Sequence, residues 1–137
     1  MEANFSEITE LYEKYGNEKY MIGEEITQKE HALQAAEIAK NCGAPAHIII
    51  GLLLHDIGQM VGLERGYTKQ ELHHCHDDIG AQWLKERGFP TAITDVCQYH
   101  TLAKVIICDR DKQYLDQLSS ASKESYFIQK KKFSNKD

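Results

Sequence analysis

Apolar residues recur at three- and four-residue spacing along most of the chain, which is the pattern of amphipathic helices. Residues 4–15 show this spacing and predict a first helix, followed by a polar loop from Gly16 to Glu25. Thr27 and Glu30 have the spacing of a capping box, so a second helix is expected to begin there. Strand signals are scarce. The pattern therefore predicts an all-α fold.

Four further helices follow from the same reasoning. The third is expected from Pro45 to Gly58, because proline suits a first helical turn and glycine a helix end. The fourth begins at a second capping box, formed by Thr68 and Glu71. This fourth helix is expected to end at Gly88, and the last two run from Pro90 to His100 and over about residues 111–122. No internal repeat or linker interrupts this series, so residues 1–129 are predicted to form one domain.

The last eight residues, 130–137, carry four lysines and show no apolar periodicity, so we expect them to form a solvated basic tail. The whole chain has a formal charge of −5, and the body before the tail is more acidic still. An acidic body argues against nucleic acid as the main partner.

The expected compartment is the cytosol. The strongly apolar run of residues 48–54 is far shorter than the roughly 20 residues that cross a bilayer, so no membrane span is expected. The first twenty residues lack the basic start and apolar centre of a secretory signal. The four cysteines show no C-x-x-C pairing, and we expect free thiols.

The candidate chemistry lies in the histidines, of which there are seven. His55 and Asp56 are adjacent at the end of the apolar third helix. A carboxylate that leaves water there must be compensated by pairing or by a metal ion. Imidazole nitrogen and carboxylate oxygen suit zinc, iron or manganese, and one carboxylate can bridge two ions. This pair therefore predicts a metal site.

Three other histidines, His31, His76 and His100, lie on separate predicted helices, and a bundle could bring them to one pocket with His55. Taken singly, each is more often a surface residue or a hydrogen-bonded core residue. A local zinc cluster in residues 73–76 is a further alternative. Neighbours on a helix point in different directions, however, which disfavours it.

Four segments taken together resemble the HD-domain superfamily. They are YMIGEEITQKEHALQAA, LLLHDIG, HHCHDDIGAQWLKERGF and YHTLAKVIICDRDKQYLDQLSSAS, and they cover about residues 20–129. Within the superfamily they are most similar to the mixed-valent diiron oxygenases that cleave the carbon–phosphorus bond of 2-amino-1-hydroxyethylphosphonate and related phosphonates, which are distant relatives of myo-inositol oxygenase. The resemblance implies a helical HD bundle with a metal site at its centre.

The resemblance also implies a ligand set for two irons in a mixed-valent pair. His31, His55 and Asp56 match ligands of the first iron, and Asp56 bridges both. His76 and His100 match the two histidines of the second iron. The implied reaction uses dioxygen to cleave a small organophosphonate and release phosphate.

The implied substrate contacts are five residues. Lys104 and Ser122 match positions that hold the phosphonate, and Gln28 and Glu24 match positions at the amine end of the pocket. Gln59 stands where the phosphonate enzymes carry a histidine, so it can donate a hydrogen bond but carry no charge.

Two other departures from the family pattern affect the expected site. Met21 stands where some members have an iron-capping tyrosine, with Tyr20 adjacent. After Gln129 the family continues to a final aspartate on the first iron, whereas this sequence turns to lysines. The resemblance thus implies a truncated member whose first iron lacks that carboxylate, with Asp109 or Asp111 as replacements if their loop folds inward.

Two other functions stay open at this stage. An HD-type phosphohydrolase would use manganese or magnesium to attack a phosphate ester with a metal-bound hydroxide. A truncated, non-catalytic metal-binding product is the other alternative. The expected partners are a small phosphonate or phosphate and, for the oxygenase, O2, whereas the oligomeric state is not predicted.

Overall fold

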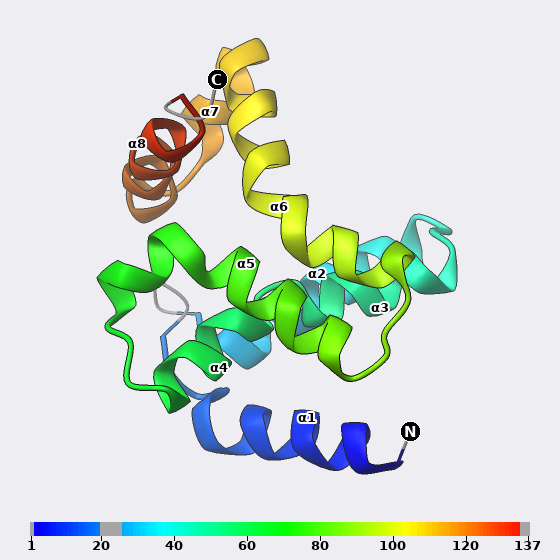
Figure 1. Cartoon of the computed structure of the whole chain (residues 1–137). Helices are drawn as coiled ribbons and strands as arrows, with labels where there is room; N and C mark the ends of the chain where they lie inside the picture. Colours follow the sequence, from blue (N-terminus) through cyan, green and yellow to red (C-terminus); the bar gives the residue numbers. More distant parts are fainter. Residues whose placement is uncertain (1, 20–25, 135–137) are drawn as a thin grey trace.

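The computed structural model describes residues 2–19 and 26–134. Within these ranges the chain forms eight helices and no strand, apart from one isolated bridge between Lys19 and Thr27, so the all-α prediction is confirmed (Figure 1). The helices are α1 (Glu2–Tyr15), α2 (Gln28–Asn41), α3 (Ala46–Leu54), α4 (Ile57–Glu64), α5 (Lys69–Glu86), α6 (Thr91–Arg110), α7 (Lys112–Gln117) and α8 (Ser120–Ser134).

Both predicted capping boxes are present. The backbone N–H of Glu30 donates to Thr27 Oγ1 at 3.1 Å, and the N–H of Thr27 donates to Glu30 Oε1 at 3.2 Å. Thr68 and Glu71 repeat this arrangement at 3.1 and 2.9 Å. Each box satisfies two N–H groups that a helix start leaves without partners. These caps fix where α2 and α5 begin, and both helices carry candidate ligands.

The prediction of one helix from Pro45 to Gly58 is wrong. The structure has two helices, and the turn between α3 and α4 contains His55 and Asp56. Gly58 lies inside α4 because the helix packs closely on α5: a Cβ on Gly58 would lie 1.8 Å from the carbonyl oxygen of His76. Gly62 also lies close to α5, since a Cβ added there would lie 2.1 Å from Leu72 Cδ2. These glycines permit close packing and do not end the helix.

The segment Ala46–Glu64 meets the length and composition criteria of a membrane-crossing helix, and it is the one such segment within residues 2–19 and 26–134. The helix breaks inside it, at His55 and Asp56, and 56% of it is buried in the protein. Core helices of folded proteins pass the same test. Its burial is that of a core segment.

The C-terminal helices also differ from the prediction. α6 continues to Arg110 instead of ending at His100, and residues 130–134, expected as an irregular tail, extend α8. The physical reason is packing, because Tyr126 is buried in a small apolar cluster and Phe133 packs against the same cluster. Residues 135–137 lie outside the described residues.

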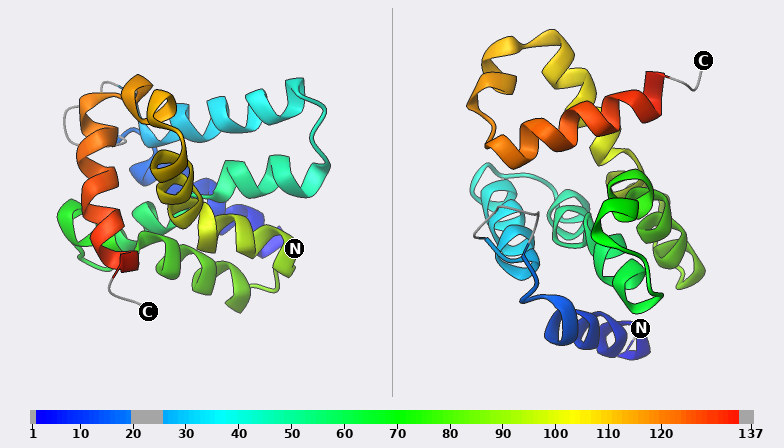
Figure 2. Two further views of the ribbon diagram at one scale, coloured as in Figure 1. Left: turned by 90° about the horizontal axis from the view of Figure 1, so that it is seen from above. Right: turned by 90° about the vertical axis from the view of Figure 1, so that its left-hand side faces the viewer.

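The core consists of two apolar clusters. The larger one joins α1 to α3, α4, α5 and α6 and contains Leu11, Leu54, Ile57, Met60, Val61, Ala81, Trp83, Leu84, Ile93 and Cys97. The smaller one joins the end of α6 to α7 and α8 around Val105, Cys108 and Tyr126. Figures 1 and 2 show α1 on one side of α2–α5 and α7–α8 on the other. Four of the five candidate ligands lie in this middle layer, α2–α5, and the fifth, His100, lies on α6.

A hydrogen bond fixes α1 beside this layer: the hydroxyl of Tyr12 donates to the carbonyl of Leu53, near the end of α3. Tyr12→Phe is expected to lower the free energy of unfolding by about 1–2 kcal/mol, because this carbonyl loses its side-chain donor. Urea unfolding of the purified protein would measure the change. Tyr15→Phe is the matched control, and an equal loss of stability in both variants would contradict the role given to Tyr12.

Candidate metal centre

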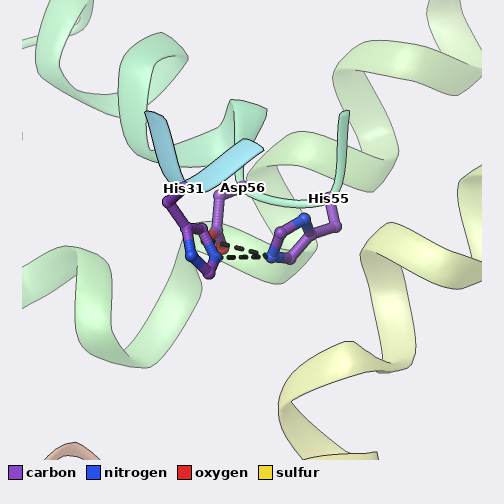
Figure 3. A group of neighbouring side chains, drawn as sticks. All are labelled: His31, His55 and Asp56. Carbon is purple, nitrogen blue, oxygen red and sulfur yellow. Dashed lines mark hydrogen bonds and ion pairs between the residues drawn. The ribbon is translucent and has the colours of Figure 1, made fainter. Parts of the chain in front are cut away.

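Asp56 lies at the centre of the candidate site. Its carboxylate is buried in the turn between α3 and α4, with 4% of the residue exposed. Oδ2 lies 3.1 Å from Nε2 of both His31 and His55 (Figure 3). Oδ1 lies 3.3 Å from His76 Nε2 and 3.1 Å from His100 Nε2. Each carboxylate oxygen thus faces one pair of imidazoles.

Four helical segments supply the histidines. His31 is in the first turn of α2, His55 follows α3, His76 is in the middle of α5 and His100 is in the middle of α6. The two Nε2 atoms are 3.0 Å apart in the first pair and 3.1 Å apart in the second. The structure therefore brings together all five side chains that the sequence predicts as ligands.

The second ring nitrogen is used in three of the four histidines. A backbone carbonyl lies within hydrogen-bond distance of each of these Nδ1 atoms, and because a carbonyl only accepts, Nδ1 carries the proton. In a neutral imidazole, Nε2 then has no proton, and its lone pair points toward the Asp56 carboxylate. Metal-binding histidines are commonly oriented in this way by a hydrogen bond from the other ring nitrogen. The pairs are His55 with Leu52 at 2.5 Å, His76 with Leu72 at 2.6 Å, and His100 with Cys97 at 2.7 Å.

These donors fit two bridged metal ions. Asp56 Oδ2 is buried and forms no hydrogen bond in the described part of the chain, which is costly unless a cation compensates it. Ligand atoms about 2.1 Å from one ion lie about 3 Å apart at right angles, close to the separations seen here. Two groups could each hold an ion: His31, His55 and Asp56, and Asp56, His76 and His100.

The charges agree with this arrangement. Burial alone would raise the pKa of Asp56, but attraction to His55 and contacts with His100 and His31 hold it well below its ordinary value. Burial lowers the pKa of His100, and Asp56 only partly offsets this. Asp56 is therefore ionised and His100 neutral at neutral pH, which are the forms that bind metal. Burial alone would lower the pKa of His55, but attraction to Asp56 outweighs burial and raises this pKa, so a metal ion bound there would displace a proton from the ring.

A cavity of about 30 Å³ adjoins the second group of ligands, enough room for a water-sized group. Two of the predicted substrate residues, Gln59 and Lys104, line it. Burial lowers the pKa of Lys104, against weaker attraction to Cys108 and Asp56. The full lining is Asp56, Gln59, His73, His76, His100, Thr101, Lys104, Ser125 and Gln129.

The other three predicted substrate residues are placed differently. Ser122 is half-buried on α8 and is not among the lining residues, whereas Ser125, one turn later, is. Gln28 is buried at the start of α2 and does not line the cavity either. Glu24 lies outside the described residues, as do Tyr20 and Met21.

Sequence reasoning missed the contribution of α8 to the cavity. Ser125 and Gln129 are both buried, and Gln129 Oε1 has no hydrogen-bond partner in the described residues. The spacing of residues 122, 125 and 129 places them on one helix face, and this polar spacing was the available signal.

The alternative zinc cluster in residues 73–76 is not formed within the described chain. Only His76 belongs to either group of candidate ligands. The thiol of Cys75 lies 3.3 Å from the carbonyl of Glu71, to which it donates, and His73 faces Ser125 at 3.4 Å. These side chains point away from one another, as expected for neighbours on a helix.

The two aspartates considered as replacement ligands are engaged elsewhere. Asp109 accepts hydrogen bonds from the hydroxyl of Tyr126 and from Lys130 Nζ, the latter at 2.9 Å. Asp111 caps α7, accepting from the backbone N–H groups of residues 113 and 114. Neither belongs to the first ligand group, so the condition under which they could replace the missing carboxylate is not met in the described residues.

Comparison with known proteins finds three curated relatives. They are a [1-hydroxy-2-(trimethylamino)ethyl]phosphonate dioxygenase (glycine-betaine-forming) of Leisingera caerulea, 38% identical over 87% of this chain and 60% of its own; a hydroxymethylphosphonate dioxygenase of Gimesia maris, 38% identical over 88% and 59%; and the uncharacterized protein L432 of Acanthamoeba polyphaga mimivirus, 32% identical over 98% and 62%. The chain spans about three-fifths of the length of these relatives.

A family comparison matches residues 29–123 to the HD domain. This range is more than half of the chain and contains all five candidate ligands, from His31 to His100. The matched range includes the adjacent buried pair His55 and Asp56. The chain belongs to the HD-domain family.

Proposed function

We propose that this protein is a diiron oxygenase that cleaves the carbon–phosphorus bond of a small organophosphonate and releases phosphate. The observation that carries the proposal is the Asp56 carboxylate, which faces one histidine pair on each oxygen. Two relatives named as phosphonate dioxygenases support it. Nitrogen and oxygen donors of this kind suit iron.

The ligands divide between two ions. His31 and His55 would hold one iron and His76 and His100 the other, with Asp56 shared. When bound, a mixed-valent iron pair supplies the binding and reduction of dioxygen that the oxidation requires. The chain holds the ligands in place through the carbonyls that fix three of the imidazole rings, so the donors are oriented before substrate arrives.

The cavity beside the second pair provides the groups that a phosphonate needs. Lys104 offers a cation, and Ser125 and Thr101 offer hydroxyl donors to the phosphonate oxygens. Gln59 and Gln129 offer amide groups that can orient the rest of a small substrate. Ser122, Gln28 and Glu24 stay predicted contacts that depend on the resemblance.

Oxygen dependence tests the proposal. The protein would be loaded with iron under low oxygen, its iron counted and its mixed-valent state read by electron paramagnetic resonance. Hydroxymethylphosphonate and 1-hydroxy-2-(trimethylamino)ethylphosphonate would then be added with and without O2, and phosphate measured. We expect phosphate only with O2. A two-iron sample that releases none from either compound would contradict the proposal.

The same assay separates the other candidates. An HD phosphohydrolase would release phosphate from an ester without O2 when loaded with manganese or magnesium, whereas a non-catalytic product would bind one ion per chain or none. Four imidazoles at the centre disfavour magnesium, which prefers oxygen ligands. The names of the two phosphonate relatives also favour the oxygenase.

Lys104 is expected to set the affinity for the anion. Lys104→Met should weaken methylphosphonate binding about tenfold or more, because a charge-assisted hydrogen bond is worth about 1.5–3 kcal/mol. Since burial lowers the pKa of Lys104, binding is present at lower pH and is lost as the pH rises through that lowered value. Lys104→Arg should keep binding to higher pH.

Isothermal titration calorimetry on the metal-loaded protein measures these affinities. Lys112→Met is the matched control, because Lys112 is exposed at the start of α7. Equal affinities in Lys104→Met and in the control would show that the phosphonate does not use this lysine.

A further inference from the structure

Helix α8 forms one wall of the cavity but packs outside the main core. It contributes Ser125 and Gln129, while the other lining residues come from α4, α5, α6 and the turn that carries Asp56. Its apolar contacts are with the smaller cluster, around Val105 and Cys108 of α6. Figures 1 and 2 show α8 above α5, on the far side of the molecule from α1. Within the described residues, the apolar contacts of α8 are thus made with the smaller cluster and not with the larger one.

The cavity is too small for the substrate class proposed above. Its volume is about 30 Å³, whereas pockets for small ligands usually measure about 300–1,000 Å³. Gln129 Oε1 is buried in this wall without a hydrogen-bond partner in the described chain. A phosphonate can therefore enter only if a wall moves, and α8 is the wall that the main core does not hold.

Polar contacts join α8 to α5. Lys132 Nζ, near the end of α8, lies 2.9 Å from Asp77 Oδ1 and 3.4 Å from Asp78 Oδ2. The pair with Asp77 is deeply buried, since 12% and 3% of the two side chains are exposed. Asp78 Oδ1 also accepts a hydrogen bond from Gln98 Nε2 of α6 at 2.5 Å. This charged cluster links the three helices that carry His76, His100 and the α8 wall.

A buried charge is costly unless its partner stays in place, so the cluster favours one position of α8. Lys132 and Asp77 satisfy each other only while α8 lies against α5. Moving α8 away returns both charges to water, so the closed position is held by a contact that can be broken and remade. Tyr126 and Phe133 would keep α8 attached to the smaller cluster meanwhile.

We propose that Lys132 is a positioning residue: its ion pairs with Asp77 and Asp78 close α8 over the cavity and control access of the phosphonate to the metal centre. The identity of what enters rests on the proposed function, but the closing contact does not. Asp77 directly follows His76, so the same contact also fixes the segment of α5 that carries this ligand.

Hydrogen–deuterium exchange on the metal-loaded full chain tests this role. Lys132→Gln should raise exchange in residues 120–134 at least about tenfold, because breaking one side of a buried pair is strongly destabilising. Exchange in α2 and α3 should be unchanged. Methylphosphonate should associate about fivefold faster, because the open position of α8 that admits it is populated more often.

Two variants serve as controls. Lys131→Gln removes the same charge from the exposed neighbouring position and should leave exchange and binding unchanged. Lys132→Arg keeps the charge and should restore both, which loss of packing alone would not explain. Unchanged exchange of α8 in Lys132→Gln, or an equal rise in Lys131→Gln, would overturn the proposal.

A second variant covers the case in which Lys132→Gln unfolds the whole chain. Asp78→Asn weakens only the more exposed arm of the cluster and should raise exchange in α8 about threefold, and no rise there would overturn the proposal. Exchange does not depend on turnover. A wild-type protein that releases no phosphate but shows these α8 responses would count against the proposed function alone.

Discussion

Asp56→Asn protein is expected to retain less than about a tenth of the metal bound by the wild type, because the affinity loss should exceed the 10–100-fold typical of outer-sphere changes. Asp56 is the one residue shared by both candidate ligand groups, so its loss affects both ions. Asparagine offers one neutral carbonyl oxygen in place of two charged ones. Metal content per chain, measured by elemental analysis after loading with iron, gives the result directly.

The pattern across variants distinguishes a shared carboxylate from two separate sites. His31→Ala should lose one ion and keep the other, because His76 and His100 belong to the second group. Asp95→Asn, an exposed substitution on α6, should keep both. Two ions in Asp56→Asn protein would show that Asp56 does not bridge, and the proposed site would have to be abandoned.

Gly58→Ala is expected to have the largest effect on folding of any single methyl group. The added Cβ would lie 1.8 Å from the carbonyl oxygen of His76 and 2.8 Å from the backbone nitrogen of Gly80. Backbone atoms on α5 cannot rotate away, so α4 and α5 must separate. A loss of about 4 kcal/mol or more is expected, which approaches the whole stability of a small domain. Urea unfolding followed by circular dichroism measures it.

Gly66→Ala is the control for this substitution. Gly66 has φ +90°, and no heavy atom lies within 4 Å of the position that a Cβ would take there. Alanine at this position therefore costs backbone strain alone, about 1 kcal/mol. If Gly58→Ala proves no more destabilising than Gly66→Ala, α4 and α5 are not in close contact. The distance from Asp56 to His76 would then need another explanation, because this contact sets it.

Sequence could predict the fold wherever its signals were local. Thr27 and Thr68 mark the starts of α2 and α5 because a capping box is complete within four residues. Gly58 misled the prediction for α4, since its role depends on the distant carbonyl of His76. The extension of α8 was missed for a similar reason, because Phe133 is stabilised by residues far along the chain. Tertiary packing decided these elements.

The candidate site, too, could be predicted only in part from the sequence. His55 and Asp56 could be identified from an unusual polar pair on an apolar helix. The predicted helices made the three other histidines candidates, and the resemblance assigned them as ligands. Their arrangement as two pairs about one carboxylate needed the structure. The spacing of Ser125 and Gln129 indicates one polar face of α8, but nothing local to the helix indicates that this face lines the cavity.

The two histidine pairs have the same separation in sequence, which bears on how the centre assembles. In each pair the residues are 24 positions apart. His31 is on α2 and His55 directly follows α3, while His76 is on α5 and His100 is on α6. Contacts between near neighbours in sequence form quickly, because little chain entropy is lost in closing the loop. During synthesis the first set of donors is complete once residue 56 has emerged, whereas the second awaits residue 100. Asp56 is therefore made before half of its partners, His76 and His100.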